Sequence, residues 1–305
     1  MRLMFSDAKI SGPSVLVLGM FDGVHTGHAW LLRTAREWGS LEGLPVVVCT
    51  FSRHPLALLN PGQVPPMLST VPERAARMAQ MKADVLAVLP FDESMRDMSP
   101  PDFVKMLIRR FSPRHIVVGF NYTFGAGGGG DARLLKKLGR ILGFDVHVVS
   151  PVQVDGHTVS SSRVRSTLAQ GDMEQAARLL ERPYAITGKV VHGKGIGRGM
   201  GFPTANVKIP RGKALPAFGI YVARARLKEG SYQAVLSLGC HPTLPEGDVT
   251  LEVHLLGGPQ DLYGKRMRVK FLKKLRDEIK FDGVQALKEQ MARDVRDAKA
   301  YFSKP

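Results

Sequence analysis

The stretch "SVLVLGMFDGVHTGHAWLL", residues 14–32, joins a short apolar run to a segment with helical spacing and places two histidines at the junction. The apolar run predicts a buried strand that ends at Gly19, and the spacing after it predicts a helix that begins between the histidines. The first turn of a helix projects free N–H groups and positive potential, and Gly27 lets the backbone approach an anion closely. His25 and His28 are therefore predicted to donate hydrogen bonds to phosphate, with metal binding and simple capping or packing as alternatives.

The first half of the chain continues the alternation of strand and helix outward from this stretch. Further strands are predicted at "LPVVVCTF", "ADVLAVLPF", "RHIVVGF" and "FDVHVVSPV", with amphipathic helices at "VPERAARMAQM", "SPPDFVKMLIRRF" and "ARLLKKLGRILG". Buried β-branched strands separated by helices indicate a Rossmann-like α/β domain, a parallel sheet with helices on both faces. Ligands bind such sheets outside the carboxyl ends of the strands, and the two histidines follow such an end.

The pattern changes after Arg182-Pro183. Strand-like segments then follow one another without helices, at "AITGKVV", "GIYVARARL", "YQAVLSLG", "VTLEVHLL" and "RMRVKFLKKL", and a C-terminal segment with apolar residues three or four apart predicts one long helix. This pattern indicates an antiparallel β-barrel with a C-terminal helix. We predict two domains, residues 1–182 and residues 183–305, because a proline favours an extended break after a helix.

Charge and cysteine content limit the environment and the partners. The chain has 305 residues and a net charge of +16, and residues 183–305 carry 22 basic and 11 acidic side chains, so the excess is C-terminal. A solvated basic strand face explains most of this excess, and attraction of an anionic substrate or a polyanion is the alternative. No apolar run is long enough to span a bilayer, and Cys49 and Cys240 lie in different predicted domains, so we expect a cytoplasmic protein with two buried, unpaired thiols.

Six motifs in order resemble one family. "GMFDGVHTGH" is similar to the G-x-F-D-G-V-H-x-G-H element of bacterial bifunctional riboflavin kinase/FMN adenylyltransferases, also called FAD synthetases. "VVGFNYTFG" and "VSSSRVRSTL" resemble that family's flavin and nucleotide loop and its S-S-T-R-I-R segment. "GKGIGRGMGFPTANV", "LEVHLL" and "DLYGKRMRVKFLKKLRDEIKF" resemble the kinase domain's glycine-rich stretch, catalytic strand and following hairpin.

For the N-terminal domain, the resemblance implies adenylylation of FMN by ATP, which gives FAD and pyrophosphate. His25, His28 and Arg163 are the expected catalytic residues, with the arginine offering a planar fork to triphosphate oxygens. Without the resemblance, Arg163 reads as a solvated loop charge. Matched positions expected to contact ATP or flavin are Gly19, Phe21, Gly27, Asn121 and Ser162, of which Ser162 replaces the family's usual threonine.

For the C-terminal domain, the resemblance implies phosphorylation of riboflavin to FMN by ATP with Mg²⁺. Strand alternation sends Thr250, Glu252 and His254 to one face, where Glu252 is either a solvent-facing charge or the general base for a primary alcohol, and the resemblance favours the base. Thr204 and Asn206 are the expected Mg²⁺ ligands. Other expected ATP- or flavin-binding positions are Gly193, Gly195, Gly197, Pro203 and Arg276.

Some positions depart from the family pattern. "SLGCHPTL" carries His241 where an amide is usual, and "GGPQ" replaces an acidic turn, which leaves flavin affinity open. The expected partners are small molecules (riboflavin, FMN and ATP), with no nucleic acid, no membrane and at most a weak homo-oligomer. Two alternatives remain: a chain with only one active domain, and a basic RNA-binding protein with a relic nucleotidylyltransferase domain.

Overall fold

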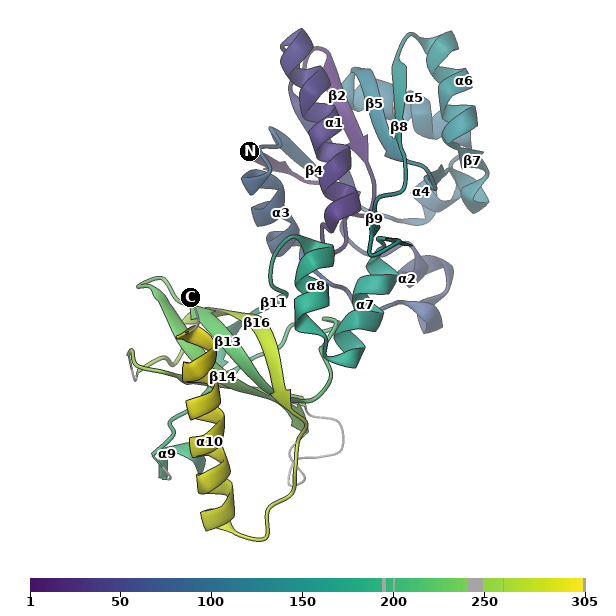
Figure 1. The fold of residues 1–305 in the computed structure, drawn as a ribbon. Helices are drawn as coiled ribbons and strands as arrows, with labels where there is room; N and C mark the ends of the chain where they lie inside the picture. The colour runs from purple at the N-terminus through teal and green to yellow at the C-terminus, as the bar shows by residue number, and fades with distance from the viewer. Residues whose placement is uncertain (194–195, 200, 241–248, 260, 304–305) are drawn as a thin grey trace. The chain divides into compact units, whose positions relative to one another are not determined.

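A computed structural model of the chain describes residues 1–193, 196–199, 201–240, 249–259 and 261–303. The chain divides into two compact units, residues Met1–Ser161 and Ser162–Pro305, and each is treated by itself. Figure 1 shows a sheet covered by helices in the first unit and a barrel with a long helix in the second.

The first unit is built on a six-stranded parallel sheet. Its order is β1 (Arg2–Met4), β4 (Val85–Leu89), β3 (Val46–Phe51), β2 (Ser14–Leu18), β5 (Pro113–Gly119) and β8 (Asp145–Val149). The five predicted strands are confirmed, and the edge strand β1 was not anticipated. From β2 the chain proceeds first toward β3 and β4 and later to the other side, to β5 and β8, so the strand order reverses between β2 and β5. This switch point is where sheets of this kind bind ligands.

Helices cover both faces of this sheet, as predicted (Figure 1). One face of the sheet packs with α1 (Thr26–Glu42) and α3 (Val71–Gln80), and the other with α5 (Pro100–Phe111) and α6 (Ala132–Leu142). Local sequence sets the helix starts: α3 has a capping box between Thr70 and Glu73, and Ser99 caps α5. Two apolar cores result, one on each side of the sheet, whose central strands β2, β3 and β4 are almost completely buried.

Short elements surround the carboxyl edge of the sheet. They are α2 (Leu56–Leu59), a 3-10 turn (Pro61–Gln63), α4 (Glu93–Asp97), the pair β6 (Thr123–Phe124) and β7 (Gly130–Asp131) around a second 3-10 turn (Ala126–Gly128), and the pair β9 (Gln153–Val154) and β10 (His157–Thr158). These pieces follow strand ends, so they place loop residues around the switch point.

The second unit contains a closed antiparallel barrel, as predicted. Its order is β11 (Ala185–Val191), β12 (Ala205–Val207), β15 (Val249–Leu255), β14 (Ser231–Cys240), β13 (Gly219–Arg226) and β16 (Arg266–Arg276). The short strand β12 and the one-turn helix α9 (Ile196–Gly199) were not anticipated. Helix α10 (Val284–Phe302) covers the outer wall where Val222, Val235 and Ala298 are buried together.

Two helices precede the barrel and pack with it. Helix α7 (Ser161–Gln170) and helix α8 (Met173–Leu180) belong to the second unit except for Ser161, and α8 lies against β16. The carbonyl of Leu168 accepts a hydrogen bond of 2.9 Å from the N–H of Ala217. The packing division therefore precedes Arg182, whereas the boundary between the two activities stays a prediction.

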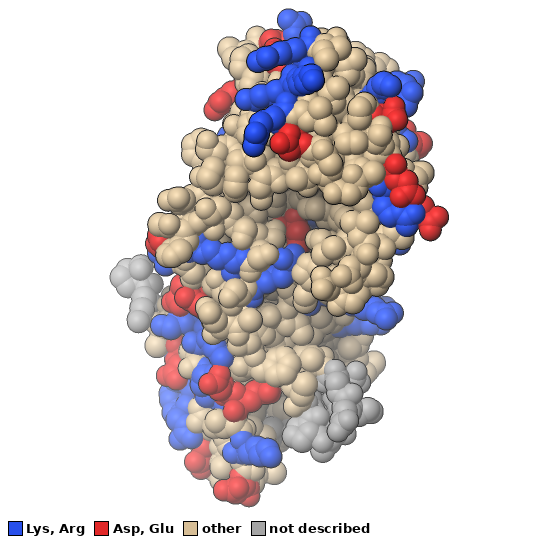
Figure 2. Space-filling model, turned by 90° about the vertical axis from the view of Figure 1, so that its right-hand side faces the viewer, with Lys and Arg blue, Asp and Glu red and all other residues tan. Residues whose placement is uncertain are grey.

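The basic strand of the barrel has the predicted alternation. Met267, Val269 and Phe271 in β16 are fully buried, and the basic residues between them point outward. On the face drawn in Figure 2, Lys and Arg gather in separate groups with Asp and Glu between them. The basic excess therefore forms no continuous surface on that face.

Candidate active sites

The turn between β2 and α1 carries the two histidines, and its backbone is tightly constrained. Phe21 and Val24 have positive φ angles, 52° and 45°, which side chains with a β-carbon rarely adopt. The buried carboxylate of Asp22 accepts hydrogen bonds from the backbone N–H groups of Leu68 and Ser69, both at 3.0 Å. The loop before α3 therefore holds the turn in a conformation that its own residues do not favour.

The two histidine rings lie against each other at the N-terminus of α1. His25 is the N-cap residue and is buried, and its ring stacks on His28 with centroids 3.8 Å apart and planes 19° apart. A β-carbon at Gly27 would lie 3.2 Å from the His25 ring, so a residue larger than glycine would crowd this ring. The arrangement presents imidazoles and helix N–H groups together, which is the donor set that a phosphate requires.

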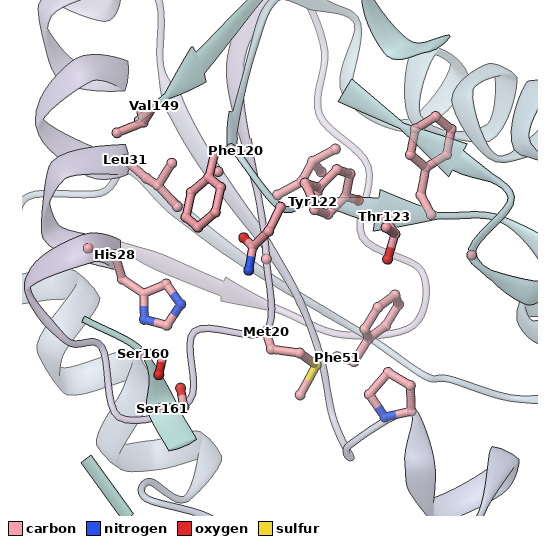
Figure 3. Close-up of a pocket in the computed structure, with 18 of the residues that line it drawn as sticks. Met20, His28, Leu31, Phe51, Phe120, Tyr122, Thr123, Val149, Ser160 and Ser161 are labelled. Carbon is pink, nitrogen blue, oxygen red and sulfur yellow. The ribbon is translucent and has the colours of Figure 1, made fainter. Parts of the chain in front are cut away.

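A cavity of about 500 Å³ opens beside these rings. It is lined by the predicted residues Gly19, His25, Gly27, His28 and Asn121, and Figure 3 shows His28 facing the space with Phe120 and Ser160 around it. The structure therefore brings the turn after β2 and the loop after β5 together at the switch point. A pocket of this size suits a small-molecule ligand.

Phe21 has a different place from the one that its motif suggested. Its side chain is fully buried and is not part of the pocket lining, and a β-carbon at Gly19 would lie 3.1 Å from its ring. The ring centroid is 5.1 Å from that of His28. Phe21 thus packs beside His28 within the core, and its expected contact with ATP or flavin stays a prediction.

The first residue of α7 and the residue before it form another side of the pocket. Ser160 and Ser161 line it, and the hydroxyl of Ser161 donates a hydrogen bond of 3.0 Å to the carbonyl of Asp22. Ser162 and Arg163 follow directly in the chain as the next residues of α7. The backbone therefore leads from the pocket to the predicted arginine within two residues.

The sequence did not identify the apolar part of the pocket. Its lining includes aromatic and apolar side chains from several strand ends and short helices: Phe51, Pro55, Leu59, Phe91, Met95, Phe103, Tyr122 and Phe124. Burial raises the pKa of the Cys49 thiol to about 12 and also raises the pKa of the Tyr122 hydroxyl, so both groups stay neutral. In the sequence, Phe51 stands at the end of a predicted strand, where ligands bind such sheets. That position alone does not distinguish a pocket residue from a core residue.

A second group of predicted residues meets on the barrel. The hydroxyl of Thr204 donates a hydrogen bond of 3.0 Å to Oε2 of Glu252, and Asn206 in β12 lies opposite Glu252 in β15. A β-carbon at Gly193 would lie 2.0 Å from the side-chain amide of Asn206, so any larger residue there would displace that amide. Residues far apart in the chain thus form one oxygen-rich group on the outward-facing side of two paired strands.

The turn around Pro203 is attached to the same strands. Nδ1 of His254 lies 2.9 Å from the carbonyl oxygen of Pro203, and the N–H of Phe202 donates to the carbonyl of Gly197 at 2.8 Å. A β-carbon at Gly197 would lie 2.4 Å from the carbonyl oxygen of Phe202. Gly195, a predicted ATP- or flavin-binding position, and His241, which departs from the family pattern, both lie outside the described residues.

Arg276, predicted to contact ATP or flavin, holds a helix in the structure. Its guanidinium makes two hydrogen bonds, 2.9 and 2.7 Å, with the buried carboxylate of Asp294 in α10 and donates a third to the carbonyl of Asp277. Such a bidentate pair fixes both partners. These contacts give Arg276 a structural task between β16 and α10.

The cysteines differ from each other. Cys49 is buried, as expected, whereas Cys240 is exposed, which contradicts the prediction that both thiols are buried. The reason is that Cys240 ends β14, where the strand leaves the barrel. Within the described ranges, no helix combines the length and the apolar character needed to cross a membrane.

The fold and both groups of residues define a two-domain transferase that handles phosphate groups. The family model for FAD synthetase matches residues 7–163, and that for riboflavin kinase matches residues 180–302. The chain therefore belongs to the family of bifunctional riboflavin kinase/FMN adenylyltransferases.

Individual relatives agree with this assignment over almost the whole chain. The bifunctional riboflavin kinase/FMN adenylyltransferase of Escherichia coli K12 is 37% identical over 290 residues, 94% of this chain and 92% of the relative. The protein of the same description from Bacillus subtilis is 35% identical over 95% of this chain and 93% of the relative. A crystal structure from Streptococcus pneumoniae, described as a macrolide-efflux protein, is similar with a TM-score of 0.90 at 30% identity and covers 98% of this chain and 99% of that one.

Proposed function

We propose that this chain makes FAD from riboflavin in two steps, with the first unit adenylylating FMN and the barrel phosphorylating riboflavin. The observation that carries the proposal is the stacked pair His25 and His28 at the N-terminus of α1, on the wall of the switch-point pocket. Both family models and the bifunctional relatives support the two activities.

In adenylyl transfer, an oxygen of the FMN phosphate attacks the α-phosphorus of ATP, and pyrophosphate leaves. No covalent enzyme intermediate is needed, so catalysis consists of positioning and charge stabilisation. The imidazoles of His25 and His28 donate hydrogen bonds to phosphate oxygens as negative charge develops, and the N-terminus of α1 adds its positive potential. Arg163 supplies a fixed positive charge from α7, and Ser162 contributes a hydroxyl.

The apolar part of the pocket fits a planar heterocycle. Phe51 and Phe91 meet edge to face with centroids 5.2 Å apart, and Tyr122 stacks against Phe124 at 5.8 Å. Rings in such arrangements accept a further aromatic face, and neutral surroundings favour an uncharged ring system. We assign this part of the pocket to a ring of the substrates, with Asn121 as a polar contact at its edge.

In the barrel, Glu252 is the proposed general base. Its carboxylate takes the proton from the 5'-hydroxyl of riboflavin, whose oxygen attacks the γ-phosphorus of ATP while ADP leaves. The hydrogen bond from Thr204 orients the carboxylate, and the absence of a side chain at Gly193 leaves the Asn206 amide in its place beside it. The backbone of Glu252 is held on both sides by strand pairing, with β12 on one side and β14 on the other.

The donor set of the barrel site fits Mg²⁺. Thr204 and Asn206 offer hydroxyl and amide oxygens, the hard ligands that this ion prefers, and few protein ligands suffice because phosphates supply others. The described residues contain no group of three or more His, Cys, Asp or Glu side chains placed to hold a metal ion. When bound, the ion neutralises charge on the phosphate oxygens.

One experiment tests the proposal. The purified chain is incubated with riboflavin, ATP and Mg²⁺, and the flavins are separated by chromatography with time. Sequential appearance of FMN and then FAD is expected. A parallel reaction contains FMN in place of riboflavin. FMN without FAD in both reactions would restrict activity to the barrel, FAD formed only from the supplied FMN would restrict it to the first unit, and no new flavin in either reaction would refute the proposal.

A further inference from the structure

Arg74 in α3 is a buried guanidinium beneath the turn that carries the histidines. Its side chain is only 2% exposed, and its Nη1 lies 3.0 Å from each of three acceptors: the carbonyl of Met20, the hydroxyl of Thr50 and the carbonyl of Phe51. The hydroxyl of Thr50 donates in turn to the carbonyl of Met20 at 2.8 Å. One nitrogen atom therefore ties together the carboxyl ends of β2 and β3.

The hydrogen bonds of Arg74 hold two residues that form part of the pocket wall. Met20 and Phe51 both line the pocket, and Figure 3 shows them with His28 among the side chains drawn around the cavity. Met20 is the second residue after β2, so the position of its carbonyl sets the direction in which the chain enters the histidine turn. A change at Arg74 would reach His28 through Met20.

Burying Arg74 here carries an energetic cost. No carboxylate within the described ranges forms an ion pair with it, its Nε has no hydrogen-bond acceptor there, and Asp22 acts on it only through its field. Burial lowers the pKa of Arg74, as expected for a cation removed from water. An apolar side chain of equal length would avoid these costs, so packing alone does not account for an arginine.

The histidine turn needs support from more than one side. Positive φ angles at Phe21 and Val24 are strained for residues with a β-carbon and persist only where neighbouring groups impose them. Asp22 anchors the middle of the turn to Leu68 and Ser69, and Arg74 anchors its beginning at Met20. Both anchors come from the same segment, residues 68–74.

We propose that Arg74 is a positioning residue for adenylyl transfer. It touches no substrate: it fixes the Met20 carbonyl against the end of β3 and so sets the place of His25 and His28 at the pocket. This inference rests on the phosphate-binding role proposed for the two histidines. It predicts that Arg74 affects the rate of the chemical step more than the binding of FMN.

The test compares Arg74→Met with Arg74→Lys in the full chain. Because a displacement of about 1 Å can cost roughly 10²-fold in rate, Arg74→Met should lower kcat for FAD formation by about that factor with little change in KM for FMN. Arg74→Lys keeps a charge and donors and should recover most of the rate. Riboflavin phosphorylation in the same sample should stay at the parental rate, and thermal unfolding followed by circular dichroism reports on folding of the first unit, which contains Arg74.

Two further variants complete the design. Arg36→Met is the control: it removes a hydrogen bond of 2.7 Å from the Arg36 guanidinium to the carbonyl of Lys82. Neither residue lines the pocket, so this variant should leave both activities unchanged. If Arg74→Met does not fold, Thr50→Val tests the inference instead. Valine has nearly the same volume as threonine, and the change removes the hydroxyl that links Arg74 to Met20. It should lower kcat for FAD formation severalfold without an effect on the kinase.

The outcomes separate this inference from the proposed function. Parental adenylylation by folded Arg74→Met, or by Thr50→Val where the former does not fold, would overturn the inference. Equal losses in both activities, or a change in KM alone, would also overturn it. If His28→Ala leaves FAD formation intact, the proposed function of the site fails, whereas loss in His28→Ala without loss in Arg74→Met refutes only the role of Arg74.

Discussion

Replacement of His28 by Phe and by Ala tests whether its ring nitrogens or its packing matter. The ring stacks 3.8 Å from His25 and lies 5.1 Å from Phe21, and phenylalanine keeps a ring in this space while it removes both nitrogens. Loss of one donor to developing charge typically costs 10²- to 10³-fold, or about 2.7 to 4 kcal/mol of transition-state stabilisation. We expect both variants to lose FAD formation by about this factor.

The assay follows FAD and FMN by chromatography in two reactions, one with FMN and ATP and one with riboflavin and ATP. Phosphorylation of riboflavin should be unaffected, because the groups assigned to it lie in the barrel. His147→Phe is the matched control, since His147 packs on Trp38 with centroids 4.4 Å apart and is not part of the pocket lining. A parental rate of FAD formation in His28→Phe would show that only the ring is needed and would refute the donor role.

Three further predictions concern the barrel, the division of the chain and the thiols. Glu252→Gln should lower riboflavin phosphorylation by roughly 10²- to 10⁴-fold and leave adenylylation of supplied FMN unchanged, as measured by flavin chromatography. Fragment 162–305 should fold and phosphorylate riboflavin but make no FAD, and it should unfold at a higher temperature in circular dichroism than fragment 183–305, which lacks the helices buried with the barrel. In the native chain a thiol reagent at pH 8 should modify Cys240 and spare Cys49, because burial raises the pKa of Cys49 from 9.0 to about 12. The contribution of this pKa shift to the free energy of unfolding is fully present below pH 9 and is lost as the pH rises toward 12.

Each of these predictions has a result that contradicts it. Normal FMN production by Glu252→Gln would make Glu252 a surface strand residue. Equal unfolding temperatures of the two fragments would mean that α7 and α8 add nothing to the barrel, and a folded but inactive fragment 162–305 would indicate a composite active site. Modification of two thiols in the native chain would show that Cys49 is accessible.

The sequence alone determined the fold class of both units and the position of the histidine turn. Apolar periodicity identified β2, β3, β4, β5, β8 and the four long helices that cover the sheet, because each such pattern depends only on neighbours within a few residues of the chain. The change of pattern near Pro183 likewise indicated a barrel. Short elements such as β1 and β12 contain three residues each, too few to show a period.

Local pattern also placed the polar groups of the sites on the correct elements. Alternation along β15 put Glu252 on the face opposite Leu251 and Val253, which are both buried. The helix start after His25 followed from the spacing of the apolar residues behind it. In each case, one strand or one helix holds all the information that the prediction needs.

Tertiary structure decided which distant residues meet. Arg74 reaches Met20 and Thr50 only because α3 packs on the sheet face beside β2 and β3, and nothing within α3 distinguishes this arginine from Arg77. Arg276 illustrates the same limit, since its partner Asp294 is supplied by a helix whose docking no local pattern describes. Contacts of this kind depend on strand register and on the packing of whole elements, so the side chains that position the two sites become visible only when the chain is folded.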